Sequence, residues 1–190
     1  MQPSSLSDLN RQFNPRLAVE DFSGVIERRR EAGRAVAESH AIGRRRYGDH
    51  PLEVFLAVDT AAGSRDPARA AVVFIHGGYW RSGSPDDNLV IAPPILSSGA
   101  LPILMGYPLC PELPLPAVIA SVARGFRAIL VASGELGFDS SRVILAGTSA
   151  GAHLAAMLMT MSETAASVSG ALLLSRIYDL TPVPLLDFNR

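Results

Sequence analysis

The chain has 190 residues, 48% of them hydrophobic, so it can bury roughly 70% of its unfolded surface around one sizeable core. All 17 basic residues are arginine, and 18 acidic residues balance them to a net charge of -1, which argues against general attraction to nucleic acid or anionic lipid. The single cysteine, Cys110, excludes an internal disulfide, and a packing role is expected for it. No apolar run is long enough for a membrane span, and the N-terminus lacks the pattern of a secretory signal. We therefore expect a cytoplasmic protein.

The N-terminal part of the chain is expected to precede the sheet. Residues 1–17 are interpreted as an extended arm, and residues 18–43 as a charged helix of weak amphipathicity. Arginine clusters at 28–30 and 44–46 alternate with acidic residues, which favours a solvated face over a polyanion site. The run 52–58 is then predicted to be the first strand, with a turn at 63–67.

A short apolar strand at 70–75 leads into a glycine-containing loop, His76-Gly77-Gly78-Tyr79-Trp80. This loop resembles the HGGG-type loop of esterases, which implies that the amides of Gly77 and Gly78 point at the oxygen that becomes negative when an acyl carbonyl is attacked. Glycine is needed in such a loop because a side chain would block that approach. For His76 we expect a structural role in shaping the turn. The loop could also be a simple turn at a strand end.

The next elements alternate between helix and strand. The segment Ser84-Pro85-Asp86-Asp87 is a favourable helix start, and that helix is expected to end near Gly99. Such alternation predicts a parallel sheet with right-handed crossovers. The remaining elements are expected as a strand at 101–105, a helix at 116–136, a strand at 142–146, a helix at 150–161 and a last strand, at the sheet edge, at 170–174.

The most informative motif lies between the strand at 142–146 and the helix at 150–161. Gly147-Thr148-Ser149-Ala150-Gly151 fits GxSxG, in which two glycines permit a turn so sharp that the central serine projects from its apex. Ser149 is thus the candidate nucleophile. The amide of Ala150 is the candidate third donor of an oxyanion hole. Chance matches to this pentapeptide are common, but the flanking strand and helix supply the context that it requires.

Together these motifs resemble those of α/β-hydrolases of the kynurenine formamidase group. The specific part of the resemblance is HGGYW followed by GTSAGAHLA, and Arg176 departs from it where a small residue is expected. Supporting similarities are Phe13-Asn14-Pro15-Arg16, Tyr47-Gly48, Gly106-Tyr107-Pro108-Leu109-Cys110-Pro111-Glu112 and Ile177-Tyr178-Asp179-Leu180.

The resemblance implies an α/β-hydrolase fold, with a mostly parallel sheet and helices on both faces. Residues 1–45 would form an N-terminal arm and helix, and residues 46–190 a partial hydrolase domain whose C-terminal strands are missing. The implied substrate is a small molecule, an aryl formamide such as N-formylkynurenine, which Ser149 would cleave through an acyl-enzyme to release formate. Tyr79 and Trp80 would offer it an aromatic wall, although packing under a lid explains them equally well. No cofactor or metal is expected, and the oligomeric state, including a homodimer, stays open.

The catalytic acid and base are not evident in the sequence. His153 lies four residues after Ser149 within the predicted helix, where packing is expected, and His40 and His50 are expected at the surface. Asp179 and Asp187 follow the serine, but the resemblance places the acid and the histidine base beyond Arg190. We therefore expect an incomplete triad. A promiscuous carboxylesterase and a non-catalytic truncated remnant remain as alternatives.

Overall fold

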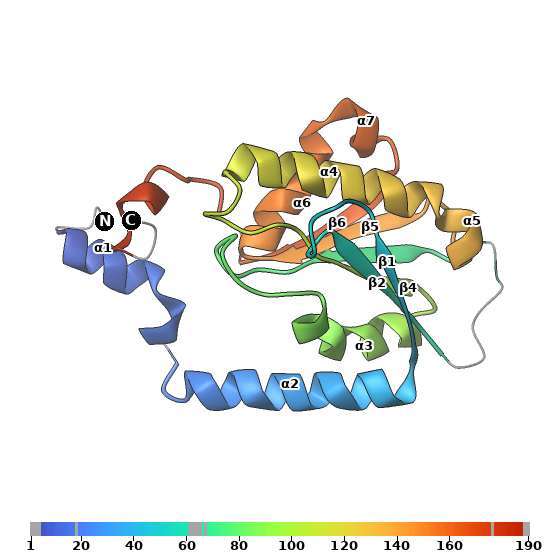
Figure 1. Cartoon of the computed structure of the whole chain (residues 1–190), viewed down its shortest axis with the longest axis horizontal. Coiled ribbons are helices and arrows are strands. Elements are labelled where there is room, and N and C mark those ends of the chain that lie inside the picture. Colours follow the sequence, from blue (N-terminus) through green and yellow to red (C-terminus); the bar gives the residue numbers. More distant parts are fainter. Residues whose placement is uncertain (1–4, 18, 61–65, 67, 176, 188–190) are drawn as a thin grey trace.

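The protein is described from a computed structural model, which covers residues 5–17, 19–60, 66, 68–175 and 177–187. Its centre is a six-stranded sheet of order β1-β2-β4-β3-β5-β6 (Figure 1). The pairs β4–β3, β3–β5 and β5–β6 are parallel, whereas β2 pairs antiparallel with both β1 and β4. The strands are β1 (Ala41–Arg46), β2 (Val54–Asp59), β3 (Ala71–Ile75), β4 (Leu101–Met105), β5 (Val143–Thr148) and β6 (Val168–Leu174).

Helices cover both faces of this sheet, as the sequence predicted. In Figure 1, α4 and α6 lie over one face, and α2 and α3 lie over the other. The helices are α1 (Leu6–Phe13), α2 (Phe22–Ser39), α3 (Ala92–Ser97), α4 (Leu115–Val131), α5 (Ser133–Leu136), α6 (Ala150–Thr160) and α7 (Ser162–Ala165), with 3-10 turns η1 (Pro15–Leu17), η2 (Asp86–Ile91) and η3 (Val183–Leu185).

The inner strands are apolar except for the last residue of β2 and of β5, as expected where both faces of a sheet are covered. In β2, Phe55 and Ala57 belong to the larger core, which includes residues of α4 and α6. Leu56 and Val58 alternate with them and pack with Val36 of α2 in a second core. Side chains of successive strand residues point to opposite faces, so one strand contributes to both cores.

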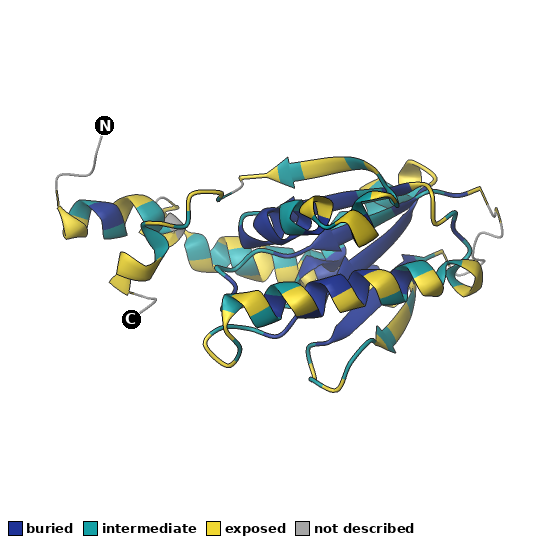
Figure 2. Cartoon of the chain, turned by 90° about the horizontal axis from the view of Figure 1, so that it is seen from above, coloured by how far each residue is buried: buried dark blue, intermediate teal, exposed yellow. Residues whose placement is uncertain are grey.

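The two edge strands differ from the inner ones. β1 and β6 are exposed or half-buried along their length, whereas the central strands are almost wholly buried (Figure 2). The predicted edge position of the last strand is therefore confirmed. Leu172 and Leu174 of this strand are exposed large apolar side chains.

Two N-terminal predictions were wrong. Residues 5–17 are not an extended arm, because Ser5 caps helix α1 by accepting a hydrogen bond from the amide of Asp8 (3.2 Å). The helix predicted over 18–43 ends at Ser39, because β1 begins at Ala41 and pairs with β2 throughout.

The other elements appear close to their predicted positions. The helix expected from 84 to 99 divides into η2 and α3, and the helix expected over 116–136 divides into α4 and α5. The predicted turn at 63–67 lies largely outside the described residues, and Arg176 lies wholly outside them.

Candidate active site

Ser149 occupies the sharp turn between β5 and α6. Its backbone lies at φ 52° and ψ -119°, a conformation that non-glycine residues rarely adopt. Its amide donates to the carbonyl of Leu174 at the end of β6 (2.8 Å), and its carbonyl accepts from the amide of His153 (3.1 Å). Bonds on both sides hold this strained residue, so the predicted strand-to-helix elbow is confirmed.

The glycines that flank Ser149 are required by close backbone packing. A Cβ added at Gly147 would lie 2.6 Å from the carbonyl carbon of Gly151. One added at Gly151 would overlap the carbonyl oxygen of Ile75 at the end of β3. The elbow is thus pressed against the neighbouring strand, at the point where the glycine-containing loop begins.

That loop lies directly against the elbow. A Cβ at Gly77 would be 2.8 Å from the Thr148 carbonyl oxygen and 3.3 Å from the Ser149 Cβ. Gly78 has φ 113°, and Tyr79 and Trp80 also have positive φ, at 52° and 58°. Strained backbone is thus concentrated at the carboxyl ends of β3 and β5, which is common at functional sites.

The three predicted oxyanion donors flank this junction. Within the described part of the chain, the amides of Gly77, Gly78 and Ala150 have no hydrogen-bond acceptor. Ala150 is fully buried at the first position of α6, where a helix leaves its amides available and favours negative charge. Of the three residues, Ala150 directly follows Ser149, and the Cβ position of Gly77 lies 3.3 Å from the Ser149 Cβ.

His76 is a structural part of the loop. Its ring stacks on Tyr107 (centroids 4.3 Å apart), and its Nδ1 lies 2.8 Å from the Gly77 carbonyl oxygen. Since a carbonyl can only accept, Nδ1 carries the proton. Burial lowers the pKa of His76 to about 4, so the ring is neutral near pH 7. The Tyr107 hydroxyl donates in turn to the His76 carbonyl (2.8 Å).

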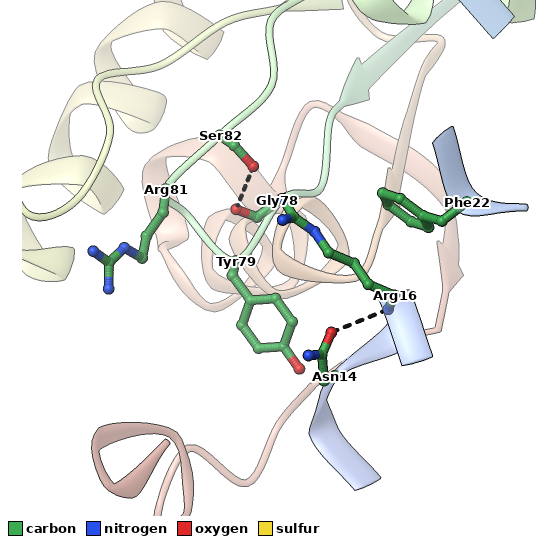
Figure 3. A pocket seen from close by; sticks show the side chains of 7 residues that line it. All are labelled: Asn14, Arg16, Phe22, Gly78, Tyr79, Arg81 and Ser82. Atoms are coloured by element: carbon green, nitrogen blue, oxygen red, sulfur yellow. Dashed lines mark hydrogen bonds between the residues drawn. The ribbon is translucent and has the colours of Figure 1, made fainter. Parts of the chain in front are cut away.

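A cavity of about 400 Å³ opens on the outer side of this loop. Loop residues form one wall and the N-terminal segment forms the other (Figure 3). The Tyr79 hydroxyl links the two walls by donating to the Phe13 carbonyl (2.6 Å). The lining residues are Asn14, Arg16, Phe22, Gly78, Tyr79, Arg81 and Ser82.

The structure separates the two aromatic residues that were predicted together. Tyr79 lines the cavity, whereas Trp80 is 3% exposed and belongs to the core. The Trp80 ring meets His153 edge to face (centroids 5.2 Å apart), and its Nε1 is buried without a partner among the described residues. Tyr79 is thus part of the cavity wall, whereas Trp80 packs in the core.

None of the hydrogen bonds made by the four imidazoles in the described structure runs to Ser149. His40 bonds near the end of α2, and His50 pairs with Glu112 (3.0 Å). His153 is buried against Trp80 with its Nδ1 unpartnered within the described residues, and burial lowers its pKa. Cys110 is half-buried beside the core, and burial raises the pKa of its thiol, which fits the predicted packing role.

Most of the cavity wall was missed at the level of sequence. Asn14, Arg16 and Phe22 come from the segment interpreted as an arm and the start of a helix, and Arg81 and Ser82 follow the loop motif. A signal was present, since Phe13-Asn14-Pro15-Arg16 is part of the resemblance noted above. The spacing of residues in the sequence, however, does not indicate that this segment packs against the loop at 76–80.

The mixed sheet with helices on both faces, and the strand-to-helix elbow at Ser149, are features of the α/β-hydrolase fold. Consistent with this, the chain belongs to the family described as alpha/beta hydrolase fold, which matches residues 72–186. The predicted fold class is thereby confirmed.

The chain is also similar in sequence to several proteins of known name. Kynurenine formamidase of Danio rerio is 29% identical over 90% of this chain and 59% of its own length, and that of Salmo salar is 28% identical over 93% and 62%. These matches confirm the predicted resemblance to the formamidase type. The carboxylesterase NlhH of Mycobacterium tuberculosis is 35% identical over 52% of this chain and 30% of its own length. The chain spans about 60% of the length of the two formamidases.

Solved structures share the fold. A thioesterase candidate from Silicibacter sp. TM1040 superposes with a TM-score of 0.75 at 22% identity, covering 95% of this chain and 66% of that one. The esterase of Pyrobaculum calidifontis gives a TM-score of 0.64 at 23% identity, covering 92% and 57%. Within the described residues, no helix of this protein has the length and apolar character of a membrane span.

Proposed function

We propose that this chain carries the nucleophile and the oxyanion hole of a serine hydrolase that cleaves aryl formamides, such as N-formylkynurenine. The Ser149 hydroxyl would attack the formyl carbon while the amides of Gly77, Gly78 and Ala150 donate to the developing oxyanion. The carbon–nitrogen bond then breaks, and the aryl amine leaves with a proton. Water hydrolyses the formyl ester on Ser149, which releases formate and restores the hydroxyl.

One observation carries this proposal: the glycine-containing loop packs directly on the elbow. The 3.3 Å approach of the Gly77 Cβ position to the Ser149 Cβ brings the loop backbone to the nucleophile. A carbonyl carbon bound at Ser149 would have its oxygen beside these donors. The choice of formamide over other acyl groups rests on the likeness to kynurenine formamidases, which extends over about nine-tenths of this chain.

Carboxylester hydrolysis is the second candidate. The match to the carboxylesterase NlhH supports it, since that match has the higher identity although it covers half of the chain. An elbow and an oxyanion hole serve esters and formamides alike. The two substrates differ in their leaving group, which is an alcohol or an amine.

We further propose that the general base is a histidine other than the four in this chain. His76 is neutral and bonded to its own loop, and His153 is enclosed beside Trp80. Without a base, Ser149 remains a neutral alcohol. Enzymes that lose a triad member keep about 10³- to 10⁴-fold acceleration over water from the oxyanion hole and binding.

Chemical rescue with imidazole tests the nucleophile and the missing base together. The 190-residue chain and its Ser149→Ala variant are assayed on a formamide and an ester of matched aryl groups, with increasing imidazole. We expect slow hydrolysis by the unmodified chain that rises with imidazole, and no response from Ser149→Ala. Equal rates for the two proteins would refute Ser149 as nucleophile. Fast Ser149-dependent turnover without imidazole would show that one of the four histidines is the base.

A further inference from the structure

The cavity beside the oxyanion loop is lined by positive charge. Seven residues surround it, and its charged members are both arginines, Arg16 and Arg81. No aspartate or glutamate is among them. Aromatic surface comes from Phe22 on the N-terminal wall and from Tyr79 on the loop. The lining thus contains both positively charged and aromatic side chains.

Arg16 is the cation best placed to meet a ligand. In Figure 3 its side chain extends from the N-terminal wall toward Gly78, while Arg81 extends away on the other side of the loop. The Arg16 guanidinium carbon lies 5.6 Å from the centroid of the Phe22 ring. Arg16 forms no ion pair with any other described residue, whereas Arg11, Arg28, Arg34 and others do.

We propose that Arg16 binds a carboxylate on the leaving group of the substrate, while Phe22 and Tyr79 contact its aromatic ring. The guanidinium offers paired donors that match a carboxylate, and the flat face of Phe22 supports it from one side. This assignment deepens the function proposed above and rests on it. The preferred substrates are therefore aryl formamides that carry a carboxylate, and neutral aryl formamides are poor substrates.

A purely structural role for Arg16 makes a different prediction. If its stacking on Phe22 only held the N-terminal wall in place, removing it would weaken every ligand of the cavity to the same extent. A carboxylate-binding role weakens anionic ligands selectively. The informative quantity is therefore the ratio of the affinities for two ligands that differ only in charge.

The ligands are β-(o-aminobenzoyl)propionate, which has the skeleton of the released aryl amine, and its neutral carboxamide. Binding of each to the 190-residue Ser149→Ala protein is measured by calorimetry, which needs no turnover. We expect the carboxylate to bind about tenfold or more tightly than the carboxamide, as charge-assisted hydrogen bonds suggest. Arg16→Gln should abolish that preference and leave carboxamide affinity unchanged, and Arg16→Lys should retain part of it.

Arg127→Gln is the matched control, because it removes one exposed arginine that pairs with Glu163 on the surface, away from the cavity. It should leave both affinities unchanged. Equal weakening of both ligands by Arg16→Gln, or no preference for the carboxylate in the parent protein, would overturn the inference. The imidazole experiment reports on Ser149 separately, so a failed hydrolase proposal and a failed carboxylate site are distinguishable.

Discussion

Burial of His76 makes the stability of the protein depend on pH. Its pKa is about 4 in the folded chain against 6.5 ordinarily, so between these values the unfolded chain binds a proton that the folded chain does not. Stability therefore falls as the pH drops through this window, by roughly 3 kcal/mol for this group.

His76→Phe keeps a ring against Tyr107 and removes the titrating group. We predict that the stability advantage of the parent protein over this variant shrinks by about 3 kcal/mol between neutral pH and about pH 4. Urea denaturation at a series of pH values measures it. A difference that stays constant with pH would contradict the proposed neutral state of His76.

Substitution of Gly151, in the elbow, can be compared directly with substitution of a glycine that has free space around it. Because a Cβ at Gly151 would meet the backbone of β3, we predict that Gly151→Ala lowers the free energy of unfolding by about 3 kcal/mol. Gly134→Ala is the control, since nothing lies within 4 Å of its Cβ position in helix α5. It should be neutral or stabilising by up to about 1 kcal/mol. Similar losses in both variants would show that the elbow is not tightly packed.

At the scale of elements, a buried carboxylate ties the start of β2 to α4. Glu53 accepts hydrogen bonds from the Ser121 hydroxyl (2.6 Å) and from Arg124 (2.5 Å). Burial alone would raise the pKa of Glu53, but these bonds and one from the His50 amide hold it below the ordinary value. The carboxylate is therefore ionised and satisfied where it is buried.

We predict that Glu53→Ala lowers the free energy of unfolding by about 3 kcal/mol, because the Ser121 hydroxyl and the Arg124 guanidinium lose their acceptor. Arg127→Ala on the same helix should change it by less than about 1 kcal/mol, since its pair with Glu163 is solvent-exposed. Chemical denaturation of the parent protein and the two variants measures the three free energies of unfolding. Equal effects would mean that the buried carboxylate does not stabilise the β2–α4 junction.

The sequence predicted those elements whose cause is local. The apolar run of β3 and the glycines around Ser149 each carry their own steric or hydrophobic reason, so the elbow could be predicted. Strand β1 could not, because its sequence AIGRRR has no apolar alternation and its conformation comes from pairing with β2. Nor could the cavity, because Arg16 and Gly78 meet only through tertiary packing. The difference between Tyr79 and Trp80 likewise depends on which way the folded loop turns each ring.

At the scale of the whole molecule, the edge strand β6 is the surface where we expect the protein to associate with itself. Leu172 is 55% exposed there, and β6 pairs on one side only within the described sheet. Exposed apolar edge strands promote association. We predict concentration-dependent self-association that Leu172→Lys reduces. Leu185→Lys should not reduce it, because Leu185 is equally exposed at 51% but lies in η3. Sedimentation velocity at several concentrations measures it, and an equal effect of both substitutions would rule out β6 as the contact.

The cavity has one wall in the core of the protein and one at its periphery. Its loop wall is continuous with the buried sheet, whereas the wall that bears Arg16 is held by the bond from Tyr79 to Phe13 and, further out, by the bond from Asp187 to Asn10 (2.8 Å). Substitutions in residues 5–22 therefore alter what the cavity accepts without disturbing the elbow. Under the function proposed above, evolutionary change in this segment would shift substrate preference while the elbow and its chemistry are inherited unchanged.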